Sequence, residues 1–356
     1  MMNMNLNNLI LALVLIGLGL FFYKYFLLIL NKYNPKLLVD NQFTKPQAFH
    51  ELPTSITGGV GIFFSLSIIY FYLFFFKNVI FYEYLSICTL FFLLGLADDI
   101  EVNINPKIRL FLMTVFLIVL INYNNFYLEK TGIEFLNNWL KDSKLFSLIF
   151  ICLCFLFVIN GANLIDGYNG LLGFHSLIIF INLFLINYLN GHSDLANLLF
   201  FQIIVLLTFL KFNFPKAKIF LGDSGSYLLG AFIAISAIKT SIANPTISPF
   251  YFCILLFYLF FEVFFSFFRK LIKEKKSPIF PDKKHLHMLL YKILLKKNND
   301  KNKSNYYVSI IINLIYLILI IPAILMMENG EFCKYYSSLF FVSYIFSYKI
   351  AHAKIQ

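Results

Sequence analysis

Eleven long apolar runs, separated by polar segments, most strongly constrain how this chain can fold. The first run, residues 6–30, is longer than the apolar core of a signal peptide, and no basic residue precedes it and no small-residue cleavage site follows it, so we expect a retained span. Most of the runs are long enough to cross roughly 30 Å of hydrocarbon as helices. The other ten runs cover residues 60–76, 80–96, 108–121, 145–159, 171–189, 195–210, 227–238, 250–268, 308–327 and 337–348.

The composition indicates the same class of protein. The chain is 60% hydrophobic and 13% charged, and it contains 46 Phe residues. Soluble domains are about 25% charged, and one water-soluble core does not absorb this much apolar material. The sequence therefore predicts an all-α, polytopic integral membrane protein with about 10–11 transmembrane helices, built as a single membrane domain over residues 1–356.

The distribution of basic residues predicts the orientation in the membrane. Alternate polar segments face the same side, and one such set holds every candidate motif together with most of the Lys and Arg residues. The positive-inside rule places that set in the cytoplasm and the N-terminus outside. This topology and anionic lipid headgroups explain the net charge of +11, so we expect no nucleic-acid partner. The set comprises residues 31–59, 97–107, 160–170, 211–226, 269–307 and the tail from 349.

Two adjacent acids, Asp98 and Asp99, follow the third run. Acidic side chains are unfavourable at the negative end of a helix dipole and costly beside hydrocarbon. They need a cation or a cationic partner, which Lys107 or Arg109 could supply from the start of the next run. Two solvated acids at a helix end are the alternative to a functional pair.

A second candidate follows the fifth run. Asn160, Asn163 and Asp166 are spaced three residues apart, which places them on one face if the segment is helical. The glycines after Asp166 permit a turn into the next run. An ordinary Asn/Gly turn is the alternative, but it does not explain why three polar groups directly follow an apolar run.

The third candidate is the segment 222–226, Gly-Asp-Ser-Gly-Ser, which leads directly into an apolar helix. Small residues such as Gly222 and Ser224 let backbone N–H groups approach a phosphate, and a helix N-terminus favours anions. Asp223 offers a hard oxygen to a magnesium ion whose other ligands are substrate phosphates. A simple turn of similar composition is the alternative.

The fourth candidate is the pair His285 and His287 in the largest polar segment, 269–307. Two His separated by one residue need not share a helix face, and no third His or Cys lies nearby in the sequence to complete a zinc site. On these residues alone, a solvated basic loop stays open as the alternative.

In this order on one membrane face, the four segments resemble the polyprenyl-phosphate N-acetylhexosamine-1-phosphate transferase family, glycosyltransferase family 4. The resemblance covers about residues 40–295 and includes an early segment with Lys45 and His50, and the pair Glu262 and Arg269. Met288 stands where the family often has another His, and the long His-rich segment of the muramyl-pentapeptide branch is missing. The branch that initiates O-antigen and teichoic-acid synthesis is therefore favoured over phospho-MurNAc-pentapeptide translocase.

The resemblance implies transfer of an N-acetylhexosamine-1-phosphate from a UDP-sugar to polyprenyl (undecaprenyl) phosphate, with release of UMP. Such a step initiates a lipid-linked cell-surface glycan, as in lipopolysaccharide or cell-wall synthesis. The resemblance also implies Mg²⁺ as the cofactor, with Mn²⁺ as a substitute, the bacterial cytoplasmic (inner) membrane as the location, and a homodimer as one assembly. A lipid phosphate monoester is largely ionised at pH 7, which favours its direct attack over a covalent intermediate on Asp98 or Asp99.

The expected site residues fall into three groups. They are the catalytic residues Asp98, Asp99, Lys107, Asp166, His285 and His287, the substrate-binding residues Lys45, His50, Asn160, Asn163, Gly222, Ser224 and Arg269, and the metal ligands Asp223 and Asn163.

Two other functions stay open. A magnesium-dependent intramembrane prenyltransferase would typically carry a further Asp one turn after its first acids, whereas Asp98-Asp99 is followed by Ile100-Glu101-Val102-Asn103. A transporter would place its polar binding groups near the middle of the membrane, whereas these groups lie at the ends of runs.

Overall fold

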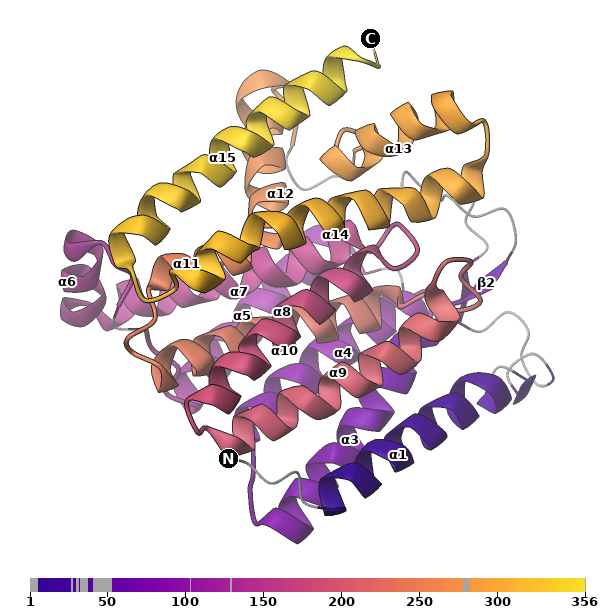
Figure 1. The fold of residues 1–356 in the computed structure, drawn as a ribbon, viewed down its shortest axis with the longest axis vertical. Helices are drawn as coiled ribbons and strands as arrows, with labels where there is room; N and C mark the ends of the chain where they lie inside the picture. The colour runs from indigo at the N-terminus through magenta and orange to yellow at the C-terminus, as the bar shows by residue number, and fades with distance from the viewer. Residues whose placement is uncertain are drawn as a thin grey trace.

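The computed structural model describes residues 6–26, 28–29, 32, 38–40, 53–102, 104–128, 130–277 and 282–355. These residues form a bundle of helices with one short two-stranded antiparallel sheet, β1 (Val39–Asp40) and β2 (Thr54–Ser55) (Figure 1). The longer helices are α1 (Leu6–Phe21), α3 (Gly58–Lys77), α4 (Tyr82–Asp99), α5 (Pro106–Tyr123), α7 (Lys144–Ile165), α8 (Leu171–Leu189), α9 (Ser193–Asn213), α10 (Gly222–Ala243), α14 (Lys301–Leu325) and α15 (Gly330–Ala353). The shorter ones are α6 (Glu134–Asp142), α11 (Pro249–Leu255), α12 (Phe257–Phe268) and α13 (Leu286–Asn298), with π-helical turns η1 (Phe22–Phe26) and η2 (Arg269–Lys273) extending α1 and α12.

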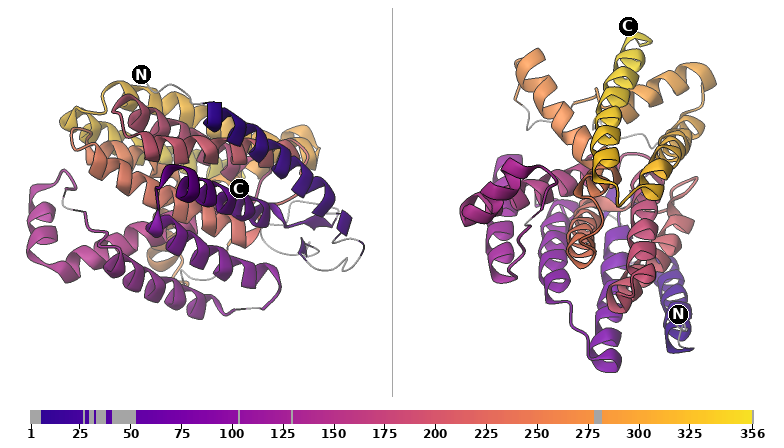
Figure 2. Two further views of the ribbon diagram at one scale, coloured as in Figure 1. Left: turned by 90° about the horizontal axis from the view of Figure 1, so that it is seen from below. Right: turned by 60° about the vertical axis from the view of Figure 1, so that its left-hand side comes forward.

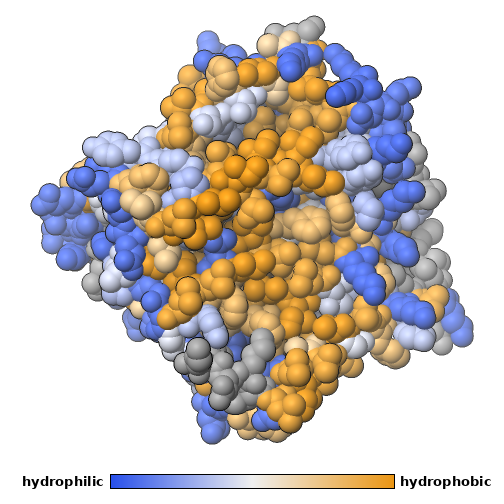
Figure 3. All heavy atoms as spheres, viewed as in Figure 1, coloured by the Kyte–Doolittle hydropathy of each residue, from blue (hydrophilic) through white to orange (hydrophobic). Residues whose placement is uncertain are grey.

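Within the described residues, the apolar runs expected from the sequence fall on helices of this bundle, and run 250–268 is divided between α11 and α12. In the described part of the chain, eight helices are long and apolar enough to cross a membrane, and a ninth span results if the bent pair α11 and α12 counts as one. Figure 3 shows a continuous apolar band over the middle of one face, with hydrophilic residues gathered toward two opposite edges. The prediction of an all-α, multi-pass membrane protein is confirmed.

Helix α10 occupies the centre of the bundle and packs against α3, α4, α7 and α8. It is the most buried of the eight span helices. Helix α4 approaches α10 so closely that a methyl group added at Gly95 would overlap the backbone carbonyl of Asp223. Small residues at helix contacts are a common means of close packing in membranes. This close approach brings the end of α4 to the start of α10.

Backbone hydrogen bonds gather the polar segments at one end of the bundle. Phe220 N donates to Ser55 O at 2.7 Å, and Gly58 N donates to Phe220 O at 3.0 Å. From the α7–α8 turn, Gly170 N donates to the Asn213 side chain at 2.7 Å. Segments that lie far apart in the sequence therefore meet at one end, as the alternation of polar segments predicts, while the side of the membrane that this end faces stays a prediction.

Three helices diverge near that end. Helices α11 and α12 are bent by 75° relative to each other at the break between them. Figure 2 shows in its right-hand view that α12, α13 and α15 spread apart above the rest of the bundle. The described parts of the polar segment 269–307, up to residue 277 and from residue 282, lie on and next to these helices, which sets the positions of its two histidines.

Candidate active site

The carboxylate of Asp99 caps the first turn of α10. Its Oδ1 accepts a hydrogen bond from Asp223 N at 2.8 Å, and its Oδ2 accepts one from Ser224 N at 2.9 Å. Gly222 begins the helix with a φ of +79°, and a Cβ there would overlap this carboxylate. The first N–H groups of a helix lack partners within the helix and attract negative charge, so Asp99 satisfies two of them. Asp99 therefore fixes the Gly-Asp-Ser loop onto the end of α4.

Asp223 projects from this first turn toward α7. Asn163 Nδ2 donates to Asp223 Oδ1 at 2.6 Å and to Ser226 Oγ at 3.0 Å. The second carboxylate oxygen, Asp223 Oδ2, lies 3.9 Å from Arg109 Nη1. The two segments predicted to bind the metal are thus in direct contact, across 60 residues of sequence.

Asp98 makes a different contact from its neighbour. Arg109 Nη1 donates to Asp98 Oδ2 at 2.7 Å, and the Arg109 guanidinium lies 5.8 Å from the centre of the Tyr227 ring. Lys107, the alternative cation, is exposed at the first turn of α5. Of the two cationic partners considered from the sequence, the structure therefore pairs Arg109 with Asp98.

Asp166 and Asn160 flank Asn163 on α7 but differ in their surroundings. Asp166 caps the C-terminus of α7, where burial, and then the charges of Asp223 and Asp99, raise its pKa well above the usual value. Asn160 Nδ2 donates to Leu156 O on its own helix at 2.7 Å. The structure therefore places Asp166 within the field of the acids, and directs the amide of Asn160 to its own backbone.

The acids form a site of negative charge with one close Arg. No group of three or more His, Cys, Asp or Glu residues within the described ranges is arranged to hold a metal ion by itself. Mg²⁺ is typically bound by one or two carboxylates with waters and substrate phosphates as the other ligands. The donor set fits this mode, since Asp223 is a carboxylate and Asn163 retains its amide oxygen while its Nδ2 donates to Asp223. Burial is the main cause of the raised pKa of Asp166, and the negative charges of Asp223 and Asp99 add to it.

The two histidines pack on a buried carboxylate, Glu262 of α12. His285 Nδ1 lies 3.1 Å from Glu262 Oε2, and Leu286 N donates to Glu262 Oε1 at 3.2 Å. His287 Nδ1 lies 3.6 Å from Glu262 Oε1 and 3.3 Å from the hydroxyl of Tyr258. Both histidines are buried, so the alternative of a solvated loop is wrong for them.

His287 also connects this cluster to the end of α7. Its ring packs edge-on against Tyr168, two residues after Asp166, with 5.7 Å between ring centres. Burial lowers the pKa of His287 below its usual value, although Glu262 opposes the shift. His287 Nε2 has no hydrogen-bond partner within the described structure.

Arg269 is engaged in ion pairs within its own segment. Its Nη1 donates to Glu274 Oε1 and its Nη2 donates to Asp282 Oδ2, both at 2.7 Å. Glu274 also accepts from Lys284 Nζ at 2.9 Å. Arg269 and Glu262, the pair noted from the resemblance, therefore both hold the segment after α12 in place, by separate contacts.

Two expected substrate-binding residues, Lys45 and His50, lie outside the described residues. Sequence reasoning missed Ser226 and Tyr258, which contact Asn163 and His287. Ser226 belongs to the 222–226 motif, so the motif itself offered a signal, whereas Tyr258 has no sequence signal within its aromatic run.

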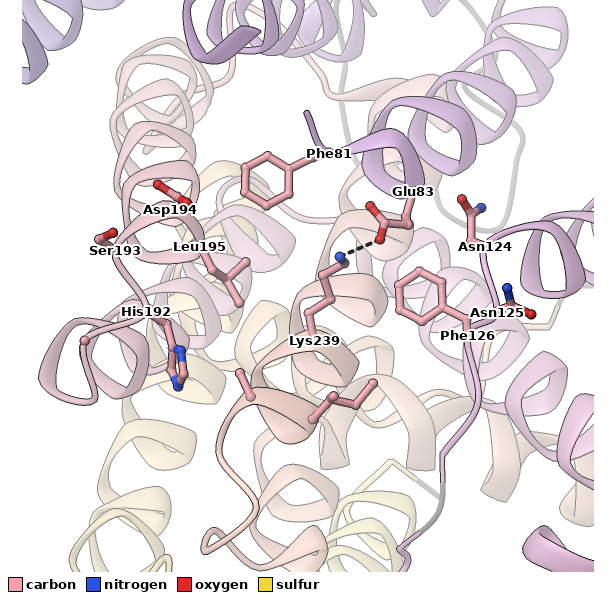
Figure 4. Close-up of a pocket in the computed structure, with 13 residues that line it drawn as sticks. Phe81, Glu83, Asn124, Asn125, Phe126, His192, Ser193, Asp194, Leu195 and Lys239 are labelled. Carbon is pink, nitrogen blue, oxygen red and sulfur yellow. Dashed lines mark hydrogen bonds and ion pairs between the residues drawn. The ribbon is translucent and has the colours of Figure 1, made fainter. Parts of the chain in front are cut away.

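A separate cavity of about 500 Å³ lies at the opposite ends of α4 and α10 (Figure 4). Lys239 Nζ donates to Glu83 Oε1 at 2.6 Å there, and the rings of Phe81 and Phe126 lie 6.0 and 5.8 Å from the ammonium. None of the expected site residues lines this cavity. The pair joins α4 to α10 at the end remote from Asp99.

Residues 80–241 match the family described as glycosyl transferase family 4, and this segment contains the whole acid cluster from Asp98 to Asp223. The match ends before Glu262 and the histidines, so their contacts are known from the structure alone.

Three curated relatives of this chain carry two names between them. An undecaprenyl-phosphate alpha-N-acetylglucosaminyl 1-phosphate transferase of Thermotoga maritima is 37% identical over 139 residues, 39% of this chain and 41% of that protein. A phospho-N-acetylmuramoyl-pentapeptide-transferase of Dictyoglomus turgidum is 35% identical over 192 residues, 52% of this chain and 59% of that protein. A second N-acetylglucosaminyl 1-phosphate transferase, of Escherichia coli K12, is 27% identical over 212 residues, 58% of this chain and 57% of that protein. The chain thus spans about half the length of the curated relatives it matches, and these similarities do not favour a prenyltransferase or a transporter.

Proposed function

We propose that this protein transfers a sugar-1-phosphate from a UDP-N-acetylhexosamine to undecaprenyl phosphate and releases UMP. One observation carries the proposal: the glycosyl transferase segment folds so that Asp99, the first turn of α10, Asp223 and Asn163 form one hydrogen-bonded cluster. The names of the relatives supply the class of acceptor and transferred group. The product is a lipid-linked sugar that initiates a cell-surface glycan.

In the proposed reaction, an oxygen of the lipid phosphate attacks the sugar-linked phosphorus of the donor. A new P–O bond forms to the lipid, the bridging P–O bond of the pyrophosphate breaks, and its electrons leave with UMP. The attacking oxygen is already largely ionised at pH 7, so no side chain has to remove a proton from it. Both carboxylate oxygens of Asp99 accept backbone hydrogen bonds, which suits a positioning role better than a nucleophilic one.

Asp223 and Asn163 would hold a magnesium ion, which neutralises pyrophosphate charge when bound. Arg109 sits between the two acid-bearing segments, 2.7 Å from Asp98 and 3.9 Å from Asp223, where a cation helps to bind phosphate. His285 and His287 are held by Glu262. The ring of Tyr168 packs against His287 and so places it next to the turn that carries Asp166. We assign these histidines to donor binding beside the acids. The bacterial cytoplasmic membrane, with this end of the bundle in the cytoplasm, is part of the same proposal, and a homodimer is its proposed assembly.

The test measures UMP release from UDP-N-acetylglucosamine and related UDP-sugars by the purified protein, with and without undecaprenyl phosphate. We expect release only with the lipid, and no radiolabelled sugar phosphate on the protein when the lipid is withheld. A trapped label would refute direct attack, and release that ignores the lipid would refute the proposed acceptor.

A matched pair of variants tests the metal site. Asp223→Asn keeps the shape of the side chain but removes a charged ligand, so turnover should nearly vanish and the required magnesium concentration should rise. Asp194→Asn makes the same change on an exposed acid at the other end of the bundle and should match the wild type. An Asp223→Asn variant with an unchanged magnesium dependence would exclude Asp223 as a ligand.

A further inference from the structure

Helix α6 joins α5 to α7 at the end of the bundle that lies away from the acids. Helix α5 runs from the Arg109 end to Tyr123, and α7 returns from Lys144 toward Asp166. Figure 1 draws α6 at the edge of the molecule, beyond the start of α7. A single residue, Ser143, separates α6 from α7, and its extended backbone (φ −128°, ψ 104°) prevents the two from forming one continuous helix.

The side chains of α6 are sorted by type around its axis. With about 100° per residue, Phe135, Trp139, Leu136 and Leu140 fall on one side of the helix. The other side carries Glu134, Asn137, Asn138 and Lys141, and Asp142 lies at the border between the two sides, about 20° from Phe135. Such a two-sided helix lies with its axis along a boundary between water and an apolar phase.

The protein covers only half of this apolar side. Leu140 is buried at 5% exposure, whereas Phe135 and Trp139, one turn apart on the neighbouring stripe, are 57% and 55% exposed. Asn137 Oδ1 accepts hydrogen bonds from the backbone and the hydroxyl of Thr131, at 2.7 and 2.8 Å, which anchors the start of the helix. The helix is therefore held against the bundle in an orientation that leaves two large aromatic rings outside it.

The exposed rings are continuous with the outer surface of α7. Trp139 packs edge-on between Phe135 and Phe146, with ring centres 5.7 and 5.4 Å apart. The exposed apolar side chains of α7 begin at Leu145 and continue through Ile149. Helix α7 is long and apolar enough to span the membrane, so this surface faces hydrocarbon. Phe135 and Trp139 of α6 therefore extend the lipid-facing surface of α7 beyond the N-terminal end of that helix.

We propose that α6 is an interfacial helix that inserts Trp139 and Phe135 into the lipid leaflet remote from the acid cluster. A phospholipid surface fits better than a protein partner, because the rings extend the lipid-facing surface of α7 and the charged Glu134 and Lys141 lie on the opposite side of the helix. Trp residues favour the level of the headgroups, where the ring meets apolar chains and the indole N–H meets polar groups. The helix fixes the depth of α5 and α7 in the membrane, and this role does not depend on the proposed transfer reaction.

Trp139 is the only Trp in the 356-residue sequence, so the intrinsic Trp fluorescence of the full chain reports on α6 alone. The protein would be reconstituted into phosphatidylcholine vesicles whose acyl chains carry bromine at a shallow or a deep position. We expect strong quenching by the shallow bromine, weaker quenching by the deep one, and little by iodide present on both sides, because such helices bury their apolar face about 5–10 Å deep. Strong iodide quenching without bromolipid quenching would show a ring in water, and no quenching by either would show a ring covered by protein. Either result would overturn the proposal.

Two variants that retain Trp139 make the test specific. Phe135→Ala removes the neighbouring ring, so bromolipid quenching should fall and iodide quenching should rise. Phe346→Ala removes a ring of comparable exposure, 65% against 57%, from α15 and should leave both signals unchanged. Equal signals from both variants would show that Phe135 does not enter the lipid with Trp139.

Discussion

The hydrogen bonds between Asp99 and the first turn of α10 make the effect of Asp99→Asn calculable. The wild-type carboxylate accepts from two backbone N–H groups, Asp223 N and Ser224 N. An amide has one oxygen and one NH₂ group, so it can accept from only one of them and turns a donor toward the other. Burial, and then the charge of Asp223, raise the pKa of Asp99 to about 7, so at pH 8 the substitution also removes a negative charge at the positive end of the α10 dipole.

The size of the loss follows from these two changes. A hydrogen bond to a charged group contributes about 1.5–3 kcal/mol, and a charge at a helix end about 0.3–1 kcal/mol. We expect the free energy of unfolding to fall by about 2–3 kcal/mol, because the two terms overlap. Asp98→Asn keeps an oxygen that can accept from Arg109 but weakens an ion pair in which the Asp98 side chain is 9% exposed, so it should cost about 1–1.5 kcal/mol, less than Asp99→Asn.

Unfolding of both variants in mixed detergent micelles, beside wild type, measures the difference. If Asp99→Asn unfolds within about 0.5 kcal/mol of wild type, or if Asp98→Asn is the more destabilised, the capping role of Asp99 is refuted. Transfer activity gives a second readout: Asp99→Asn should lose turnover because the first turn of α10 is no longer held on α4.

Three further predictions concern other contacts. Gly95→Ala places a methyl group against a backbone carbonyl of α10 and should destabilise the bundle by about 1–3 kcal/mol, whereas Gly17→Ala, with no atom within 4 Å, should be neutral or slightly stabilising in the same unfolding assay. Because burial lowers the pKa of His287, the unfolded chain takes up a proton that the folded chain does not as pH falls below about 6.5, so stability should decline there, and a His287→Gln variant should show a flatter pH profile. Glu83→Lys should destabilise the protein by repulsion from Lys239, and adding Lys239→Glu should restore most of the stability in the same unfolding assay. No recovery in the double variant would show that the pair does not stabilise the fold.

The sequence predicts where the helices lie better than where they begin. The expected run 227–238 falls inside α10, but the helix starts at Gly222, because Asp99 supplies a cap from a segment 124 residues away. Likewise, α5 starts at Pro106, ahead of the expected position, with the Asn105 side chain accepting from Lys107 N. Local patterns do not contain the capping partner of α10, because it comes from another helix, whereas Asn105 and Pro106 are a local signal for the start of α5.

The candidate site was predictable in its parts and not in its pairings. Acids and amides beside apolar runs indicated Asp98, Asp99, Asn163 and Asp223, which the structure brings to one end of the bundle. The sequence could not indicate that Asp99 binds backbone while Asp98 binds Arg109, because neighbouring residues on a helix point in different directions.

The same limit applies to the histidines. The spacing of His285 and His287 leaves their partner open, and only the fold shows that Glu262, from the preceding helix, holds both. A buried carboxylate needs such partners, which explains why the motif packs inward instead of lying in solvent.

Two side-chain contacts join α4 to α10: Asp99 binds the first turn of α10, and Glu83 pairs with Lys239. These contacts constrain how the two helices can change length during evolution. Glu83 and Asp99 are 16 residues apart on α4, and Asp223 and Lys239 are 16 residues apart on the antiparallel α10. Each interval is therefore about 24 Å of helix, and adding one residue to either would shift its end by about 1.5 Å and turn it by about 100°. Relatives that keep both contacts should therefore have an insertion or deletion in one helix interval only together with an equal change in the other. The loops between the helices remain free to vary.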